Sequence, residues 1–486
     1  MSVHVTHAGD LDPTAVLAVS RGASLVLDHD ALRPVEAGRE RLQRVLEAGR
    51  PVYGATTGAG AQSSVALEAA ARAAQSASIL LARQVGGPPW LSVAEVRAVL
   101  AVRLRTFLSG DSGVGSDLCR WLVDLLDAGV VPAVPRTSAG SAGEIVPLAH
   151  AFGHLAGDGQ VLDGGEVVSA APVLATAGLE RPALAPKEGI ALLAGVPVST
   201  ALAVLRTDEV RRLAEVALTV AAAQVAVVGA SRDPYEPWTA RGDAELAAVL
   251  ERLSSAAGPE PAPRHLQAPV SFRVAGVVLA QVERTAAALD AAVARALDGV
   301  TDSPALRPGD DPAAVGTAGF HGLDLASASD AVTAAVVHAA TTGAARLHRM
   351  LDPVVTGLPA QLSVDPGPQA GLVAVHKRAV GVVRGCQPVT SSVSLADATS
   401  LGQEDVQAPA IDATETTRRA VDAWRDVLAC ELLAVHQATV LDPSRREGMT
   451  SSVRSLLDEV AVVLPPGAAD RPWGRDVEAL VELLGR

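Results

Sequence analysis

Aromatic and sulfur-containing residues are scarce in this sequence of 486 residues. Only 2% of the residues are aromatic, with two tyrosines in all, and the three cysteines Cys119, Cys386 and Cys430 lie far apart. This spacing excludes a cysteine-rich metal site and a dense disulfide framework, and it is typical of buried thiols in a reducing cytoplasm. The shortage of aromatic side chains also disfavours a protein built mainly from β-strands.

Positively charged residues are fewer than negatively charged ones, and the sequence does not open with the pattern of a secretory signal. The chain has 40 Lys and Arg against 54 Asp and Glu, a net charge of −14, which argues against nucleic acid as a partner. No basic region followed by an apolar run opens the sequence, so we expect no secretory signal. The most apolar run, 213–229, contains Glu215 and Gln224, which favours a helix buried in protein over a membrane span. We therefore expect a cytoplasmic protein.

What the sequence has in abundance is alanine and helical periodicity. Hydrophobic residues make up 49% of the chain and the mean hydropathy is +0.28, which suits helix bundles and large oligomer interfaces. Apart from a β-like segment at 24–28, the pattern predicts a mainly all-α protein with long antiparallel helices. We expect an N-terminal domain over 1–195, and a long-helix bundle with C-terminal helices over 196–486. Helices are predicted at 65–83, 92–108, 115–128, from about 144, and at 198–229, 270–298, 323–350, 367–384, 413–440 and 475–485.

Residues 138–150 carry the most informative motif, Ser-Ala-Gly-Ser-Ala-Gly-Glu-Ile-Val-Pro-Leu-Ala-His. It resembles the signature of the aromatic amino acid ammonia-lyases, Gly-Ser-x-Gly-Ala-Ser-Gly-Asp-Leu-x-Pro-Leu-(Ala/Ser)-His. Further motifs of that family follow in the same order. They include Val-Tyr-Gly at 52–54, Lys-Glu-Gly-Ile-Ala-Leu at 187–192, Ser-Phe-Arg at 271–273, Phe-His at 320–321 and Gln-Glu-Asp at 403–405. The resemblance implies the fold of histidine ammonia-lyase and a homotetramer whose active sites combine three subunits.

The resemblance also defines a departure from the family. The family's inner Ala-Ser-Gly cyclises and loses water to form an electrophilic methylidene-imidazolone (MIO) group. Here the aligned triad is Ser141, Ala142 and Gly143, so alanine stands where the eliminated serine hydroxyl should be. We therefore expect no MIO and no other cofactor.

Two matched residues imply that chemistry is retained. The family tyrosine that removes the proton from carbon β matches Tyr53, and the family arginine that binds the substrate carboxylate matches Arg273. A free phenol ionises only at about pH 10, so such a base needs positive potential nearby. A guanidinium suits a carboxylate because it offers two parallel N–H donors. The alternatives are a tyrosine that only stabilises a loop and an arginine in a structural salt bridge.

Other positions differ from the family or have less certain roles. The family asparagine and second tyrosine are Ala194 and Val270, and the histidine of histidine lyases aligns with Arg83. We expect Arg83 to bind a second anionic or electron-rich group of the substrate, or else to lie at a subunit interface.

Four further residues complete the predicted site. Glu404 aligns with a glutamate of histidine lyases and is a candidate catalytic residue, with an ion-pair or capping role as the alternative. Gln267 and Phe320 belong to matched motifs and are candidate substrate-binding residues. Lys377 lies on a predicted helix, either facing the substrate ring or exposed to solvent. The pair His150 and His154 has the spacing of a zinc helix but lacks an intervening acid, so we expect no metal site.

Loss of the electrophile narrows the possible reactions. A quaternary ammonium leaves more readily than ammonia, and a ring that delocalises negative charge makes the carbon β proton easier to remove. Ergothionase resembles this family, lacks MIO, and releases trimethylamine from ergothioneine, a thiolated histidine betaine. We expect a similar MIO-independent carbon–nitrogen lyase acting on a small carboxylate substrate. The alternatives are another MIO-free reaction, such as a biosynthetic dehydration or cyclisation, and a non-catalytic ligand-binding homologue.

The absent hydroxyl at Ala142 gives a direct prediction. The intact mass of the purified protein should equal that of the unmodified chain, because no serine hydroxyl is present in the centre of the triad to be lost as water. High-resolution mass spectrometry tests this. A species lighter by one water, localised to residues 140–143, would contradict it.

Overall fold

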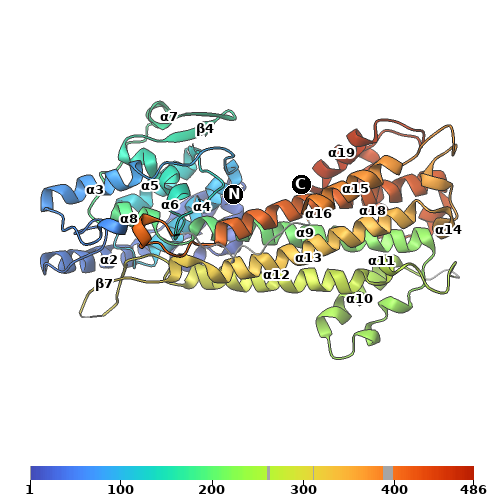
Figure 1. Ribbon diagram of the computed structural model, residues 1–486, viewed down its shortest axis with the longest axis horizontal. Coiled ribbons are helices and arrows are strands. Elements are labelled where there is room, and N and C mark those ends of the chain that lie inside the picture. Colours follow the sequence, from blue (N-terminus) through green and yellow to red (C-terminus); the bar gives the residue numbers. More distant parts are fainter. Residues whose placement is uncertain (1, 139, 260–262, 310, 387–397, 486) are drawn as a thin grey trace. The chain divides into compact units, whose positions relative to one another are not determined.

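The computed structural model describes residues 2–138, 140–259, 263–309, 311–386 and 398–485 (Figure 1). By its internal contacts the chain forms two compact units. Unit 1 comprises Met1–Arg206, Leu289–Asp330 and Ser391–Glu415, and unit 2 comprises Thr207–Ala288, Ala331–Thr390 and Thr416–Arg486. Most of unit 1 therefore comes from the predicted N-terminal domain, and two later segments of the chain complete it. The predicted boundary after residue 195 stays a prediction.

Unit 1 is a group of short and medium helices with three small sheets. Its helices are α1 (Pro13–Ser20), α2 (His29–Glu47), α3 (Ala69–Leu81), α4 (Val93–Leu108), α5 (Ser116–Asp127), α6 (Ile145–Phe152), α7 (Ala170–Thr176) and α8 (Glu188–Leu193). Helix α4 begins at a capping box, in which Ser92 and Glu95 bond each other's backbone N–H groups. Pro147 falls in the first turn of α6, where its missing N–H leaves no helical bond unmade.

The strands are short. β1 (Ser2–Val5) pairs in parallel with β2 (Ser24–Leu27), and β6 (Ala305–Leu306) pairs antiparallel with β7 (Ala314–Val315). The third sheet has the order β3 (Val131–Pro132), β4 (Gln160–Asp163), β5 (Glu166–Ser169). A Gly164-Gly165 turn joins β4 to β5, and both glycines have positive φ, 58° and 91°, as a tight hairpin turn requires.

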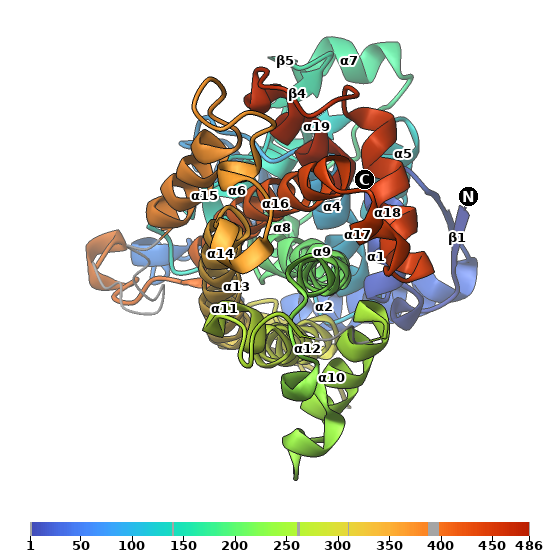
Figure 2. The same cartoon turned by 90° about the vertical axis from the view of Figure 1, so that its right-hand side faces the viewer.

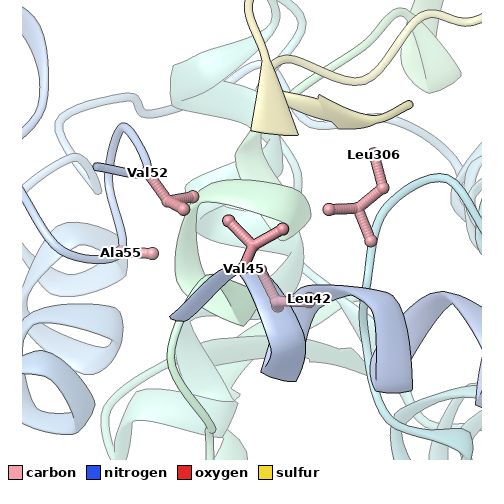
Figure 3. Close-up of a cluster of buried hydrophobic side chains, with 5 residues drawn as sticks. All are labelled: Leu42, Val45, Val52, Ala55 and Leu306. Carbon is pink, nitrogen blue, oxygen red and sulfur yellow. The ribbon is translucent and has the colours of Figure 1, made fainter. Parts of the chain in front are cut away.

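A small hydrophobic cluster anchors the loop that carries Tyr53. Leu42 and Val45 of α2 meet Val52, Ala55 and Leu306 in a cluster whose members are each at most 2% exposed (Figure 3). Because Val52 immediately precedes Tyr53, burial of its side chain fixes where the tyrosine leaves the core. The start of this loop is therefore held by packing against α2.

Four long helices begin in one unit and end in the other along the chain: α9 (Pro197–Val228), α12 (Ala275–Asp298), α13 (Leu323–Met350) and α16 (Ala410–Leu441). Within unit 2 they run side by side (Figures 1 and 2). A buried polar group joins three of them. Arg346 of α13 pairs with Glu431 of α16 at 3.0 Å and donates to Gln224 of α9 at 2.9 Å.

The other helices of unit 2 flank these long ones. They are α10 (Ala244–Ala257), α11 (Val270–Arg273), α14 (Pro353–Thr356), α15 (Val373–Cys386), α17 (Ser444–Glu447), α18 (Ser451–Val463) and α19 (Trp473–Gly485). Short 3-10 helices in the two units are η1 (Ala8–Asp10), η2 (Gly60–Gln62), η3 (Gly153–Ala156), η4 (Asp233–Tyr235), η5 (Pro237–Ala240), η6 (Gly319–His321), η7 (Ala360–Leu362) and η9 (Ser400–Gly402).

The predicted all-α class is confirmed, with two local corrections. The helix predicted over 270–298 is broken at Val274, whose backbone (φ −90°, ψ 1°) ends α11 before α12 begins. The helix predicted from 367 begins only at Val373, because Gly367 and Pro368 form a turn before it. One apolar segment, Glu188–Val228, is long enough to cross a membrane, but 83% of its most apolar window is buried within the protein. This is the burial expected of a core helix.

Candidate active site

A cavity of about 360 Å³ in unit 1 is lined by Tyr53 and Glu404, the two predicted catalytic residues. Its wall combines the Tyr53 loop, the end of α3, the triad loop, α8 and three later segments. The lining residues are Tyr53, Ala59, Gly60, Arg83, Ala142, Gly143, Ile145, Ile190, Leu193, Ala194, Gly195, Ser303, Pro304, Gly316, Phe320, Gln403 and Glu404. Apart from a few polar groups, this wall is apolar, so charges inside it interact more strongly than in water.

The phenol oxygen of Tyr53 has a defined hydrogen-bond donor. The backbone N–H of Gly60 donates to it at 2.6 Å. Tyr53 as a whole residue is 38% exposed, so the residue that carries this oxygen remains accessible. Gly54 follows with φ 67°, and a Cβ there would lie 3.0 Å from the Ile190 side chain, so only glycine lets the loop approach α8 this closely. Negative charge that develops on the phenol oxygen is stabilised by the Gly60 N–H.

Arg83 places a positive charge in the same cavity. Its Nη1 donates to the Ile79 carbonyl at 3.3 Å, and no carboxylate of the described residues forms a salt bridge with it. Burial lowers the pKa of the guanidinium, while the nearby Tyr53 and Glu404 act in the opposite direction. A half-buried cation without an acid partner is suited to bind an anionic or electron-rich ligand group.

Glu404 joins the triad loop to a second loop. One carboxylate oxygen accepts the backbone N–H of Ala142 at 3.0 Å, and the other accepts the hydroxyl of Ser400 at 2.9 Å. Ser141 is bound to the same second loop, because its carbonyl accepts the Ala408 N–H at 3.1 Å. Glu404 therefore positions the backbone of Ala142 as well as placing negative charge beside the cavity.

The triad does not fit the family's prosthetic group. The Ala142 side chain at the cavity wall is a methyl group, which has no oxygen to eliminate. Ser141 is 8% exposed, and in the shifted triad that it would centre the third residue is Ala142, whose side chain hinders ring closure.

Three predicted substrate-binding residues belong to unit 2. Arg273 ends α11 and is half-buried, and its Nε has no hydrogen-bond partner. No salt bridge to Arg273 occurs among the described residues, and its role stays a prediction. Gln267 and Lys377 are exposed on unit 2. The cavity itself brings together Tyr53, Arg83, Phe320 and Glu404 with Ala142 and Gly143 of the triad.

Sequence reasoning missed several parts of this site. Gly60 contributes a backbone N–H, and Gly195 and Pro304 line the wall without a polar side chain. Ser303 also lines the wall, and its hydroxyl bonds the backbone of Thr317. The motif Lys-Glu-Gly at 187–189 marked α8, but nothing in it showed that α8 walls the cavity.

Glu144, next to the triad, is a buried carboxyl with unusual surroundings. It is 1% exposed and accepts the backbone N–H groups of Val198 and Ser199 at 2.5 and 2.7 Å, which caps α9. Burial raises the pKa of Glu144 to about 7, although these N–H donors and the Arg103 charge act in the opposite direction. Loss of water around the carboxylate is the larger effect.

The raised pKa predicts a pH-dependent stability. Since the folded state binds this proton more tightly than the unfolded state, the stabilising contribution is complete below the ordinary value of 4.5 and is lost as the pH rises through about 7. Glu144→Gln cannot titrate, so its free energy of unfolding should fall less than the parent's between pH 5 and pH 8. Urea denaturation at both pH values measures this. If the free energy of unfolding falls by the same amount in the two proteins between pH 5 and pH 8, the raised pKa of Glu144 is contradicted.

Comparison with known proteins identifies the family. The model of the family described as aromatic amino acid lyase matches residues 11–461. A histidine ammonia-lyase of Symbiobacterium thermophilum is 31% identical, over 97% of this chain and 94% of that protein. A probable histidine ammonia-lyase of Halobacterium salinarum is 33% identical, over 98% of this chain and 94% of that protein.

Solved structures share the fold. The tyrosine aminomutase of Streptomyces globisporus matches with a TM-score of 0.93 and 25% identity, over 100% of this chain and 97% of that chain. The ergothionase of Treponema denticola, solved with desmethyl-ergothioneine sulfonic acid, matches with a TM-score of 0.91 and 21% identity, over 100% and 99% of the two chains. At 21% identity, the match to ergothionase shows a shared fold and nothing about the reaction.

Proposed function

The chain belongs to the aromatic amino acid lyase family, and on that premise we propose that it is a MIO-independent carbon–nitrogen lyase. The observation that carries the proposal is one cavity holding Tyr53, Arg83 and Glu404 around Ala142. The groups for proton removal and ligand binding are retained, whereas the hydroxyl needed for the electrophile is missing. A pocket that keeps the groups for proton removal and binding but lacks that hydroxyl suits a substrate whose amine leaves without covalent activation by an electrophile.

The proposed step is an elimination across a carbon–carbon bond. Tyr53, as phenolate, takes the proton from carbon β. The electrons of that C–H bond form the carbon–carbon double bond, and the bond between carbon α and nitrogen breaks. A quaternary ammonium then departs as a neutral tertiary amine that carries the bonding pair. Charge and atoms balance without a cofactor, because the leaving nitrogen is already positive.

The substrate class follows from the charged groups. We assign Arg273 to the substrate carboxylate, since its guanidinium has no acid partner among the described residues. Arg83 suits an anionic or electron-rich ring substituent. Lys377 and Glu404, with Gln267 and Phe320, complete the proposed binding residues. A thiolated histidine betaine such as ergothioneine meets these requirements.

We further propose that the working enzyme is a cytoplasmic homotetramer. The alanine-rich long helices offer the apolar surface that a large interface needs. Light scattering tests this, and a stable folded monomer at micromolar concentration would contradict it.

Incubation with ergothioneine tests the proposed reaction. The purified protein should release trimethylamine, detected by mass spectrometry, and should release no ammonia from histidine under the same conditions. Histidine is the matched control because its ring, carboxylate and carbon skeleton are the same apart from sulfur and the methyl groups. Ammonia from histidine without trimethylamine from ergothioneine would overturn the proposal.

Tyr53→Phe should lower kcat by at least roughly 100-fold, the usual loss when a general base is removed. The substitution keeps the ring and removes only the oxygen that accepts the Gly60 N–H. Its melting temperature should therefore stay close to the parent's, which controls for unfolding. Turnover within a factor of a few of the parent would show that another group removes the proton.

Arg273→Lys should raise KM for the substrate roughly tenfold or more, because a lysine keeps the charge but loses the bidentate donors. The control is Arg284→Lys on the following helix, where the arginine pairs with Glu245 at 2.6 Å. That variant should keep the parent's KM. Equal KM values for Arg273→Lys and the parent would remove Arg273 from the substrate site.

A further inference from the structure

Behind the cavity wall lies a group of buried charges, each next to a wall segment. Lys187 precedes α8, Asp302 precedes the lining residues Ser303 and Pro304, and Glu144 follows the triad. Lys187 Nζ lies 3.7 Å from Asp302 Oδ2, with the two side chains 0% and 2% exposed. Charges buried to this degree are retained only where they are paired or hydrogen-bonded, so they restrict the backbone around them.

Arg103 of α4 is the central cation of this group. It is fully buried, and burial lowers its pKa to about 10 while the charges of Asp302 and Glu144 act in the opposite direction. The side chain therefore stays charged near neutral pH. Its Nη2 donates to the carbonyl of Ala194, a residue of the cavity wall. Arg103 itself is not among the lining residues, so that carbonyl is bound on the side away from the cavity.

The direction of this carbonyl determines the direction of the next N–H. The Ala194–Gly195 peptide is trans, and in a planar trans peptide the C=O and the N–H point in opposite directions. The Gly195 N–H therefore points away from Arg103. Gly195 itself lines the cavity, so this N–H is directed toward the cavity side of the wall. No acceptor for it is found in the described part of the chain. A buried N–H without a partner is rare and calls for one.

We propose that the Gly195 N–H is a substrate-binding donor that receives an anionic oxygen of the substrate, and that Arg103 is the positioning residue that aims it. Gly195 has φ 83°, and a Cβ there would lie 3.0 Å from Thr301 Oγ1, so the position accommodates only glycine. Ala142 and Ala194 contribute only methyl side chains to the wall, so this N–H adds a directional polar contact there.

The assignment of that oxygen to a carboxylate rests on the proposed function. A neutral N–H donor bonds a carboxylate without neutralising it, and hydrogen bonds to charged groups are stronger than those between neutral groups. The contact would fix the orientation of the substrate's acid end while Tyr53 approaches carbon β.

A crystal of the parent protein soaked in sodium formate tests the site without assuming the substrate. Formate is the smallest carboxylate, and one of its oxygens should lie about 3 Å from the Gly195 nitrogen. In Arg103→Lys the planar donor is lost, so formate should be absent from this position. Arg97→Lys is the matched control, since Arg97 is another buried arginine of α4 that binds only backbone carbonyls, those of Val19, Leu126 and Ala23. Formate absent from Gly195 in the parent protein would overturn the inference.

Replacement of the N–H itself gives the second arm. Gly195→glycolate, introduced by nonsense suppression, exchanges the N–H for an ester oxygen and should raise KM for ergothioneine about tenfold or more. Gly129→glycolate, in the turn after α5 and outside the lining residues, should leave KM unchanged. An unchanged KM in the Gly195 variant overturns the inference even if ergothioneine is a substrate. If formate binds at Gly195 but the protein does not turn over ergothioneine, the binding site is supported and the proposed function is wrong.

Discussion

The candidate active site depends on the burial of charge behind its wall. Arg103, Lys187, Asp302 and Glu144 are all less than 2% exposed, and each is adjacent to, or hydrogen-bonded with, a segment of the wall. Removing one of these charges would leave another without compensation inside the protein, which is strongly unfavourable. The wall segments are therefore fixed by electrostatic requirements as well as by packing. This is how a cavity built from loops keeps a defined geometry.

The triad loop keeps a defined structure although alanine stands at its centre. Glu404 holds the Ala142 amide, and Glu144 binds the start of α9 to the end of the same loop. The loop is thus ordered by carboxylates on both sides, although its central residue has no reactive side chain. In the cavity, the Tyr53 oxygen accepts the Gly60 N–H, and Arg83 supplies a cation that forms no salt bridge with the described residues. What remains is suited to binding and proton transfer.

Much of this was predictable from sequence, and the limits have physical causes. Helical periodicity predicted the long helices, and motif order predicted that Tyr53 and Glu404 would be site residues; both line one cavity. Arg83 was predicted as a ligand for an anionic group or an interface residue; it lines the cavity, and both alternatives stay predictions. The roles of Gly60 and Gly195 were not predictable, because a backbone N–H leaves no mark in the sequence. The acidity of Glu144 depends on burial, which only the fold determines.

The central claim is that this pocket eliminates an amine without an electrophilic group. The most direct test is to treat the protein with sodium borohydride, which reduces an electrophilic methylidene, remove the reagent, and then measure trimethylamine release from ergothioneine. A histidine ammonia-lyase treated in parallel shows that the reagent acts. We predict that the treated and untreated protein turn over at the same rate. Loss of turnover after treatment would contradict the account.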